Sequence, residues 1–546
     1  MRPDRARRRP SPVPGGGGAA VMGFARTWAV ALVGLDGAMV EVEADIGQTL
    51  PAFSIVGLPD AALNEARERL RAAARNSGMP LSPRKLTVNL TPATLPKRGS
   101  LFDLAIVLSA LQAAGSVPAT GRTVFLAELG LDGALRPVRG ILPAVMAAVR
   151  AGHERIVVCE ANAAEAALVP GARVAGYGCL AEVLAAAGAD PRGLHRPAPA
   201  APSAVAPSTT EQGDPGPGRA VPDGVATSPD LADVAGQEDG RLALEIAAAG
   251  GHHLLMVGPP GSGKTMLAER LPGLLPDLED DAAMEVTAIH SLGGSAQRRT
   301  ALIRRPPFEA PHHTVSSAAL CGGGTGIPRP GAASRAHRGV LFLDEAPEFD
   351  RGVIDALRQP LESGRVTIDR AVASAVYPAR FQLVLAANPC PCGQSGGRGA
   401  DCTCTPRVRR SYFGKLSGPL LDRVDLQITV PKVSYGELAS GAGRAEPTAA
   451  VAARVAAARG AQAERLRRLG LRTNAELGTA LLHGPLRPPR AVTAPLERAM
   501  DRGALTARGH QRVLRVAWTL ADLDGRGAPA VEDVDTALYF RSLVPA

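Results

Sequence analysis

The sequence contains few aromatic residues and no long apolar segment. Aromatic residues make up 3% of the 546 positions, whereas Ala, Gly, Pro and Arg are used heavily, which we interpret partly as a coding bias. No run approaches about 18 uninterrupted apolar residues, so we predict no membrane span. Residues 1–21 contain arginine and proline but no apolar core, so they do not resemble a secretory signal. We therefore expect a cytoplasmic protein.

The chain also lacks a strong charge of one sign outside its first residues. Its formal net charge is +9, but residues 1–21 contain five arginines against one aspartate, which leaves only about +5 for the remainder. This balance permits a nucleic-acid partner without requiring one. We expect residues 1–22 to be a disordered tail, either an unfolded extension or a segment upstream of a true start at Met22.

The length of the chain predicts several domains, because 546 residues are too many for one hydrophobic core. Residues 23–190 alternate strand-like and helix-like segments, which predicts an α+β domain. Residues 191–230 are rich in Pro, Ala, Gly and Ser, as flexible linkers are. Residues 231–435 form a second globular segment, of α/β type, and residues 436–546 are expected to be a helical C-terminal lid. In the first domain we expect strands at Trp28–Val33, Met39–Val42, Lys85–Leu90, Val124–Glu128 and Arg155–Cys159, and helices at Asp60–Ser77, Phe102–Ala114 and Leu142–Ala151.

The strongest motif is GPPGSGKT, residues 258–265, which fits the P-loop pattern without a departure. It follows an apolar strand, His253–Val257, and opens a helix, Met266–Leu271. Backbone N–H groups of such a loop surround a β-phosphate, and the helix N-terminus adds partial positive charge. The motif therefore predicts ATP and Mg²⁺ as cofactors, with Lys264 on the β- and γ-phosphates and Thr265 on the metal. The expected nucleotide-binding residues are Gly258, Pro259, Pro260, Gly261, Ser262, Gly263, Lys264 and Thr265.

Polar residues also follow two later apolar strands. Asp344 and Glu345 end the strand in GVLFLDE, and Asn388 ends the strand Phe381–Ala387. Because ligands sit at the carboxyl edge of parallel sheets, we expect Asp344 to bind the Mg²⁺ shell and Glu345 to polarise the attacking water. Asn388 is expected to contact that water or the γ-phosphate, the alternative being a simple strand-to-turn asparagine.

Two arginines are candidates for a shared ATP site. Arg423 lies in LLDRVDL, and Arg508 begins the last helical segment in LTARGHQRVLRVA. A ring ATPase needs one arginine from the neighbouring subunit and often a second from its own lid. Each could instead form an ordinary surface salt bridge.

Four of the seven cysteines are close together in the sequence: Cys390, Cys392, Cys402 and Cys404. Without an export signal, disulfides are not expected, and four thiolates suit a tetrahedral structural Zn²⁺. The alternative is a loop of free reduced thiols. Nearby, the adjacent pair His312 and His313 is expected to have a loop role, since neighbouring residues do not easily share one metal.

These motifs together resemble the ComM/YifB family of magnesium-chelatase-like AAA+ proteins over nearly the whole chain from Met22. The resemblance implies a hexameric ATPase that works on DNA, with a branch-migration helicase role in natural transformation. It also implies that Arg423 is the arginine finger and that Arg508 is the second sensor. Val366–Pro378 resembles the hairpin before the sensor strand and Phe308–Leu320 the helix-2 insertion, and related ring helicases use such loops on DNA. The segments that carry it are ARTWAVALVGLDG, NLTPATLPKRGSLFDLAIVLSAL, PFEAPHHTVSSAAL, LRQPLESGRVTIDRA, LAANPCPCG and LSGPLLDRVDL; LADVAGQ, Leu231–Gln237, resembles the segment that wraps the adenine.

The first domain resembles the proteolytic domain of Lon-type proteases, which has the ribosomal S5 domain 2 fold. Leu101 stands where the nucleophilic serine of those enzymes is expected, and Leu142 stands where the catalytic lysine is expected. Ser100 lies nearby, but without a base its hydroxyl is not activated. We therefore expect a non-proteolytic regulatory or binding domain.

The leading prediction is an ATP-driven DNA motor that assembles as a homo-oligomer. The rivals are a magnesium-chelatase motor subunit and a regulatory ATPase that remodels proteins. Since the charge outside residues 1–21 is small, DNA contacts are expected from local basic groups: Arg304, Arg305, Arg365 and Arg370.

Overall fold

The computed structural model describes residues 23–198, 229–293, 299–324, 328–370, 374–395, 402–436 and 445–542, apart from 49, 58–59, 96 and 98–99. These residues form two compact units. The first holds most residues up to 198, and the second holds those from 229 onward together with 32–37 and 139–144. No helix of the described segments is long and apolar enough to cross a membrane. The expected tail, 1–22, and residues 199–228 of the expected linker lie outside the described residues.

A mixed sheet forms the centre of the first unit. β2 and β4 run antiparallel, whereas β1, β5, β8 and β9 are joined in that order by parallel pairings. Alternate residues of β4 are buried, as expected for a strand with one face on the core. The strand order is β3 (Phe53–Val56), β4 (Lys85–Thr91), β2 (Asp36–Gly47), β1 (Phe24–Val33), β5 (Val124–Leu126), β8 (Arg155–Cys159) and β9 (Arg173–Tyr177).

Helices α1, α2 and α5 bury their apolar side chains in one core with this sheet. Every residue of α2 is buried, in keeping with its apolar sequence DLAIVLSALQA. The structure confirms each strand and helix expected for this domain, and among the elements it adds are β3, β9, α4 and α5, which the sequence did not indicate. The helices of the unit are α1 (Asp60–Asn76), α2 (Asp103–Ala113), α3 (Ile141–Arg150), α4 (Glu160–Ala166) and α5 (Leu180–Ala186).

A five-stranded sheet forms the centre of the second unit, and all of its strand pairs are parallel. The carboxyl ends of the strands therefore lie at one edge. Alternate side chains of the strand β10 pack into two cores on opposite faces of the sheet. Leu254 and Met256 lie in one core, and Leu255 and Val257 lie in the other. The order is β11 (Phe308–Glu309), β14 (Val340–Leu343), β17 (Gln382–Ala387), β10 (Leu254–Val257) and β18 (Leu426–Thr429).

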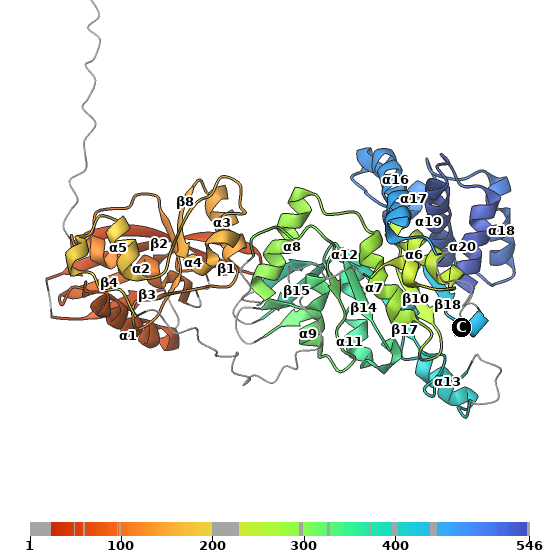
Figure 1. Cartoon of the computed structure of the whole chain (residues 1–546), viewed down its shortest axis with the longest axis horizontal. Helices are drawn as coiled ribbons and strands as arrows, with labels where there is room; N and C mark the ends of the chain where they lie inside the picture. Colours follow the sequence, from red (N-terminus) through yellow and green to blue (C-terminus); the bar gives the residue numbers. More distant parts are fainter. Residues whose placement is uncertain are drawn as a thin grey trace, which may run out of the picture. The chain divides into compact units, whose positions relative to one another are not determined.

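The C-terminal helices, which we call the lid, pack on this sheet through a shared core. Val455, Trp518 and Phe540 of the lid join Leu244 of α6 (Glu238–Gly250) and Leu267 of α7 (Lys264–Leu274) in one apolar cluster. Figure 1 shows the blue lid helices gathered beside α6 and β18. The main lid helices are α16 (Thr448–Leu466), α18 (Arg490–Asp501), α19 (Ala507–Leu523) and α20 (Val531–Ser542).

A hairpin and short helices lie between the strands of this sheet. β15 (Arg365–Asp369) and β16 (Ser374–Pro378) pair antiparallel with Val366 opposite Tyr377, which confirms the hairpin expected there. The segment after β11 contains α9 (Ser317–Cys321), and α12 (Arg358–Ser363) precedes the hairpin.

Candidate functional site

The P-loop connects β10 to α7, as the sequence predicted. Gly261 and Gly263 have φ values of 74° and 93°, a conformation that favours glycine. A Cβ on Gly258 would lie 2.2 Å from the carbonyl oxygen of Val430, so only glycine fits there. Lys264 Nζ donates to the carbonyl oxygens of Gly258 and Pro259 at 2.7 and 3.0 Å, and burial lowers its pKa. The loop has the tight cradle that a nucleotide phosphate requires.

The ends of neighbouring strands bring two further polar side chains, Asp344 and Asn388, to this loop. Thr265 Oγ1 donates to Asp344 Oδ2 at 2.7 Å, which joins the two expected Mg²⁺ ligands. Lys264 Nζ donates to Asn388 Oδ1 at 3.2 Å. The register explains this convergence, because Val257 lies opposite Ala387 and Leu343 lies opposite Leu385. Oxygen ligands at a P-loop fit a small hard cation such as Mg²⁺.

Glu345 has an unusual backbone and a partner that the sequence did not indicate. Its φ of 51° is left-handed, which is uncommon for a residue with a side chain. His313 Nδ1 lies 3.6 Å from Glu345 Oε2, so the loop that carries the histidine pair comes close to Glu345. No sequence signal was available, because the strand that precedes His313 and pairs with β14, β11, is only two residues long. His312 instead contacts Thr314, with Nδ1 2.9 Å from Oγ1.

The segment Leu231–Gln237 contacts the P-loop through its last residue. Gln237 Nε2 donates to the carbonyl oxygens of Ser262 at 3.1 Å and Pro431 at 2.6 Å. Arg270 of α7 in turn donates to the carbonyl oxygen of Asp230 at 2.6 Å. These contacts hold the segment beside the loop, where the resemblance predicted an adenine-binding segment.

Arg423 and Arg508 lie together at the opposite edge of the sheet. Arg508 Nη1 pairs with Asp422 Oδ2 at 3.1 Å, and Asp425 N–H donates to the carbonyl oxygen of His253 just before β10 begins. Because β10 has four residues, about 10 Å of strand separates this edge from the P-loop. Among the described residues, neither arginine contacts the P-loop of its own chain.

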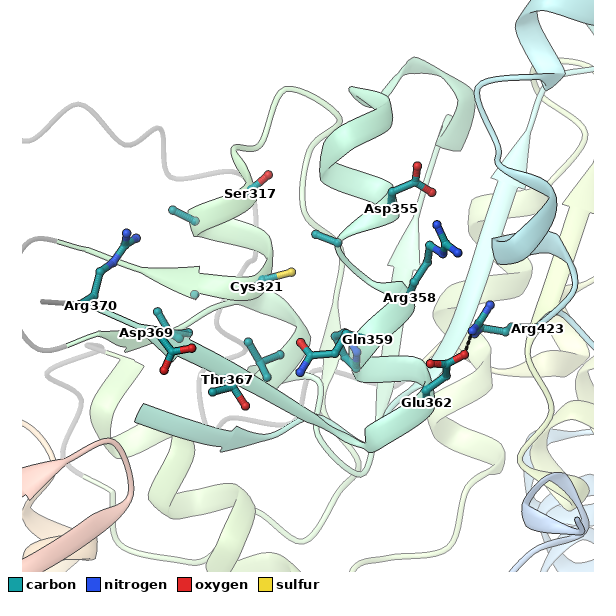
Figure 2. A pocket seen from close by; sticks show the side chains of 16 residues that line it. Ser317, Cys321, Asp355, Arg358, Gln359, Glu362, Thr367, Asp369, Arg370 and Arg423 are labelled. Atoms are coloured by element: carbon teal, nitrogen blue, oxygen red, sulfur yellow. Dashed lines mark ion pairs between the residues drawn. The ribbon is translucent and has the colours of Figure 1, made fainter. Parts of the chain in front are cut away.

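Arg423 is largely buried and close to other cations. It forms an ion pair with Glu362 and donates to the carbonyl oxygen of Pro419. Burial, and then the charges of Arg358, Arg508 and Arg512, lower its pKa. Arg423, Arg358 and Glu362 lie at one end of a cavity of about 830 Å³, and Arg370 of the hairpin lies at the other (Figure 2).

The four clustered cysteines come together beside the P-loop. Their sulfur atoms all lie within 4.8 Å of one another, and Cys402 Sγ is 3.7 Å from Sγ of both Cys390 and Cys392. Four sulfurs around one Zn²⁺ would be about 3.8 Å apart, so the geometry fits a tetrahedral site. Gly393 packs so closely on Pro260 that a Cβ on it would lie 2.5 Å from the proline Cδ. A metal here would therefore order a loop that contacts the P-loop.

Ser100 in the first unit has a partner that the sequence did not indicate. Its hydroxyl donates to a carboxylate oxygen of Glu128, so an acceptor that the sequence did not indicate lies beside it. Leu142, at the position expected for a catalytic lysine, is fully buried. Leucines thus occupy both positions, 101 and 142, at which Lon-type proteases have the nucleophilic serine and the lysine that activates it.

Family comparisons match three consecutive parts of the chain. The model described as "Magnesium chelatase, subunit ChlI" matches residues 230–438, "Subunit ChlI of Mg-chelatase" matches 42–162, and the C-terminal model of the same subunit matches 445–541. The first match contains the P-loop, Asp344, Glu345 and the cysteines.

Three relatives align over almost their full lengths. An uncharacterized protein of Mycobacterium tuberculosis is 50% identical over 95% of this chain and 99% of its own. YifB of Escherichia coli is 40% identical over 94% of this chain and 96% of its own, and competence protein ComM of Haemophilus influenzae is 39% identical over 96% and 98%. Lon protease 2 of Bacillus subtilis is 33% identical over only 26% of this chain and 27% of its own, so the likeness to Lon is partial. The chain therefore belongs to the ComM/YifB family of magnesium-chelatase-like AAA+ proteins.

Proposed function

We propose that this protein is an ATP-hydrolysing ring motor that acts on DNA, in the manner of a branch-migration helicase used in DNA uptake or recombination. The observation that carries the proposal is the separation of two groups of residues on one sheet. The P-loop, Asp344, Glu345 and Asn388 lie at the carboxyl edge, whereas Arg423 lies with Arg508 at the other. One copy thus offers both halves of an ATP site without joining them, which favours a ring of identical subunits.

The carboxyl edge supplies the groups that ATP hydrolysis needs. Lys264 and the P-loop N–H groups would hold the β- and γ-phosphates, and Thr265 and Asp344 would hold Mg²⁺. Glu345 would accept a proton from the attacking water, and Asn388 would orient that water or the γ-phosphate. Bound Mg²⁺ supplies charge neutralisation between the phosphates.

The arginine edge would complete the site of the neighbouring subunit. Arg423 would stabilise the charge that develops on the γ-phosphate, an effect worth about 10³ to 10⁵ in rate. Arg508, which pairs with Asp422 next to Arg423, is proposed to act on the same neighbouring nucleotide instead of the one in its own chain. The resemblance to ComM favours a hexamer.

DNA as the partner is supported by the relative's name as a competence protein and by exposed basic residues. Arg365 and Arg370 on the hairpin are exposed. Arg304 is a weaker candidate than the sequence suggested, because it forms an ion pair with Asp280 at 2.7 Å. Phosphate contacts from such loops would bind DNA with little sequence preference.

A chelatase motor is the second candidate, since the matching family models carry the name of a chelatase subunit. The two functions differ in what stimulates ATP turnover. We expect ATPase activity to rise when single-stranded or branched DNA is added at low salt. Activity unchanged by any DNA, with a response to a porphyrin and chelatase partners, would contradict the DNA motor.

Two variants serve as controls for that measurement. Lys264→Ala is expected to abolish nucleotide binding or turnover, because the lysine contacts the phosphates. Glu345→Gln is expected to bind ATP normally and hydrolyse it about 10² to 10⁴ times more slowly, because only the general base is removed. Substantial turnover in either variant would contradict the assignment of the site.

We also propose that Cys390, Cys392, Cys402 and Cys404 hold a structural Zn²⁺. The support is the match between the sulfur spacing and a tetrahedral zinc site.

A further inference from the structure

The lid contacts the short loop that carries Arg423 through three arginines. The loop comprises residues 422–425 and leads from α14 (Gly418–Leu421) into β18. Three of its four residues each accept a hydrogen bond from a different lid arginine, and the fourth is Arg423 itself. The contacts are Arg508 Nη1 to Asp422 Oδ2 at 3.1 Å, Arg541 Nη1 to the Val424 carbonyl oxygen at 2.8 Å, and Arg512 Nη1 to Asp425 Oδ1 at 2.9 Å.

The same lid also contacts the nucleotide side of its own subunit. Leu267 and Leu271 of α7, the helix that begins at Lys264, share one apolar core with Val451 and Val455 of α16 and with Val516 of α19. Helices in a close-packed core move together. A shift of α7 on phosphate binding would therefore reach, through this core, the arginines that contact residues 422–425.

We infer that Arg541, together with Arg512, is a positioning residue for Arg423, so that the lid of one subunit sets the place of the arginine in the ATP site of the next. This inference rests on the proposed function of Arg423. Arg541 reaches neither nucleotide, and it acts through the backbone of Val424. The contact between Arg541 and Val424 would give a route by which nucleotide binding in one subunit changes hydrolysis in its neighbour.

Arg541 is the better of the two residues for a test. Arg512 pairs with Asp425, whose side chain is 1% exposed, so removing Arg512 would leave a buried carboxylate without its cation. Arg541 donates to a backbone carbonyl, and its removal leaves no buried charge. Arg459 offers a matched control: it lines one cavity with Asp422, Arg423 and Asp425, but its Nε and Nη2 donate to the carbonyl oxygen of Ala248 at 2.9 and 2.6 Å and not to that loop.

The first measurement compares ATP affinity and turnover of full-length Arg541→Met, Arg541→Lys and Arg459→Met. Arg541→Met is expected to lower kcat about tenfold to 10²-fold with ATP affinity within about twofold of wild type. Lysine keeps a charged donor and should restore most of the activity, and Arg459→Met should stay within about twofold of wild type. An unchanged kcat in Arg541→Met, or an equal decrease in Arg459→Met, would overturn the inference.

The second measurement asks in which subunit the defect acts. Arg541→Met subunits keep an intact P-loop, whereas Glu345→Gln subunits keep an intact arginine loop. Mixed rings should therefore hydrolyse ATP faster than either variant alone. Should Arg541→Met not fold, Arg541→Gln, which keeps a neutral donor, takes its place with the same expected recovery.

A parallel mixture of Arg423→Ala with Glu345→Gln separates failure of this inference from failure of the proposed function. If this mixture recovers activity and the Arg541 mixture does not, the lid does not position Arg423 and only the present inference is wrong. If the Arg423→Ala mixture also fails, the shared ATP site of the proposed function is wrong.

Discussion

Two P-loop side chains, Lys264 and Thr265, each contact a polar side chain that follows a different strand. Lys264 contacts Asn388, and Thr265 contacts Asp344, although these pairs are 124 and 79 residues apart in sequence. Such contacts fix the side chains before any substrate arrives, which reduces the ordering that binding must accomplish. The neighbour of Glu345 does not follow a strand of this group: it is His313, whose Nδ1 lies 3.6 Å from Glu345 Oε2.

The contact with His313 predicts a decrease in turnover when the imidazole is removed. His313→Ala frees the Glu345 carboxylate, and we expect kcat to fall between about tenfold and 10²-fold while the affinity for ATP stays unchanged. His312→Ala is the matched control, since His312 contacts Thr314 instead, and it should retain near-normal turnover. Steady-state ATPase kinetics with direct nucleotide-binding measurements would check this; equal effects of the two substitutions would show that the contact has no role of its own.

At the scale of elements, periodicity and motif context were informative where the chain is locally simple. The apolar runs before Gly258, Asp344 and Asn388 are buried parallel strands, and a continuous apolar run is what such strands require. The antiparallel hairpin at Arg365–Pro378 was expected from the family resemblance. The two-residue strand β11 was not, because Phe308–Glu309 is too short to show any period.

Contacts between distant elements could not be predicted from the sequence. Nothing in LTARGHQRVLRVA indicates that Arg508 lies beside Asp422, because that contact depends on how α19 packs beside residues 422–425. The pairing of His313 with Glu345 and the packing of Gly393 on Pro260 depend in the same way on tertiary structure. Motifs predicted the residue types of the site, whereas packing decides which of them meet.

The cysteine loop gives a prediction at this scale. Purified protein is expected to contain close to one zinc per chain, and replacing both Cys390 and Cys402 by serine should remove it. Because Gly393 packs on Pro260, removal of the metal should also weaken ATP binding by severalfold. Metal analysis of freshly reduced protein, paired with ATP titration, tests both points. Cys159→Ser, at a buried cysteine of the first unit, is the control and should retain the metal. Protein without zinc would leave the cysteines as free thiols.

At the scale of the whole molecule, the small net charge outside residues 1–21 indicates that DNA is contacted by local groups of basic residues. Residues outside the first 21 carry only about +5, so dispersed attraction cannot account for tight binding. Removing one side chain that binds a phosphate should lower the salt slope of DNA binding by about 0.7–0.9. The double variant Arg365→Ala/Arg370→Ala is therefore expected to weaken binding to DNA of any sequence. Its salt slope should be lower by about twice the value for one contact.

Deleting residues 1–21 is the comparison for that variant. Residues 1–21 carry five arginines against one aspartate, which add nonspecific attraction to DNA, so ATP-dependent binding through the hairpin should remain nearly intact. Salt-titrated DNA affinity is the measurement. If the deletion abolishes binding and the double variant does not, residues 1–21 are the DNA site and the hairpin is not.

The central claim is that two copies of the chain build one ATP site, and mixing two inactive variants tests it most directly. Arg423→Ala and Glu345→Gln should each bind ATP and each show almost no turnover. In randomly mixed rings about a quarter of the interfaces join an intact P-loop site to an intact arginine, so ATPase activity should reappear. A mixture that stays inactive while both proteins assemble and bind ATP would contradict the claim, as would an Arg423→Ala monomer that is as active as wild type.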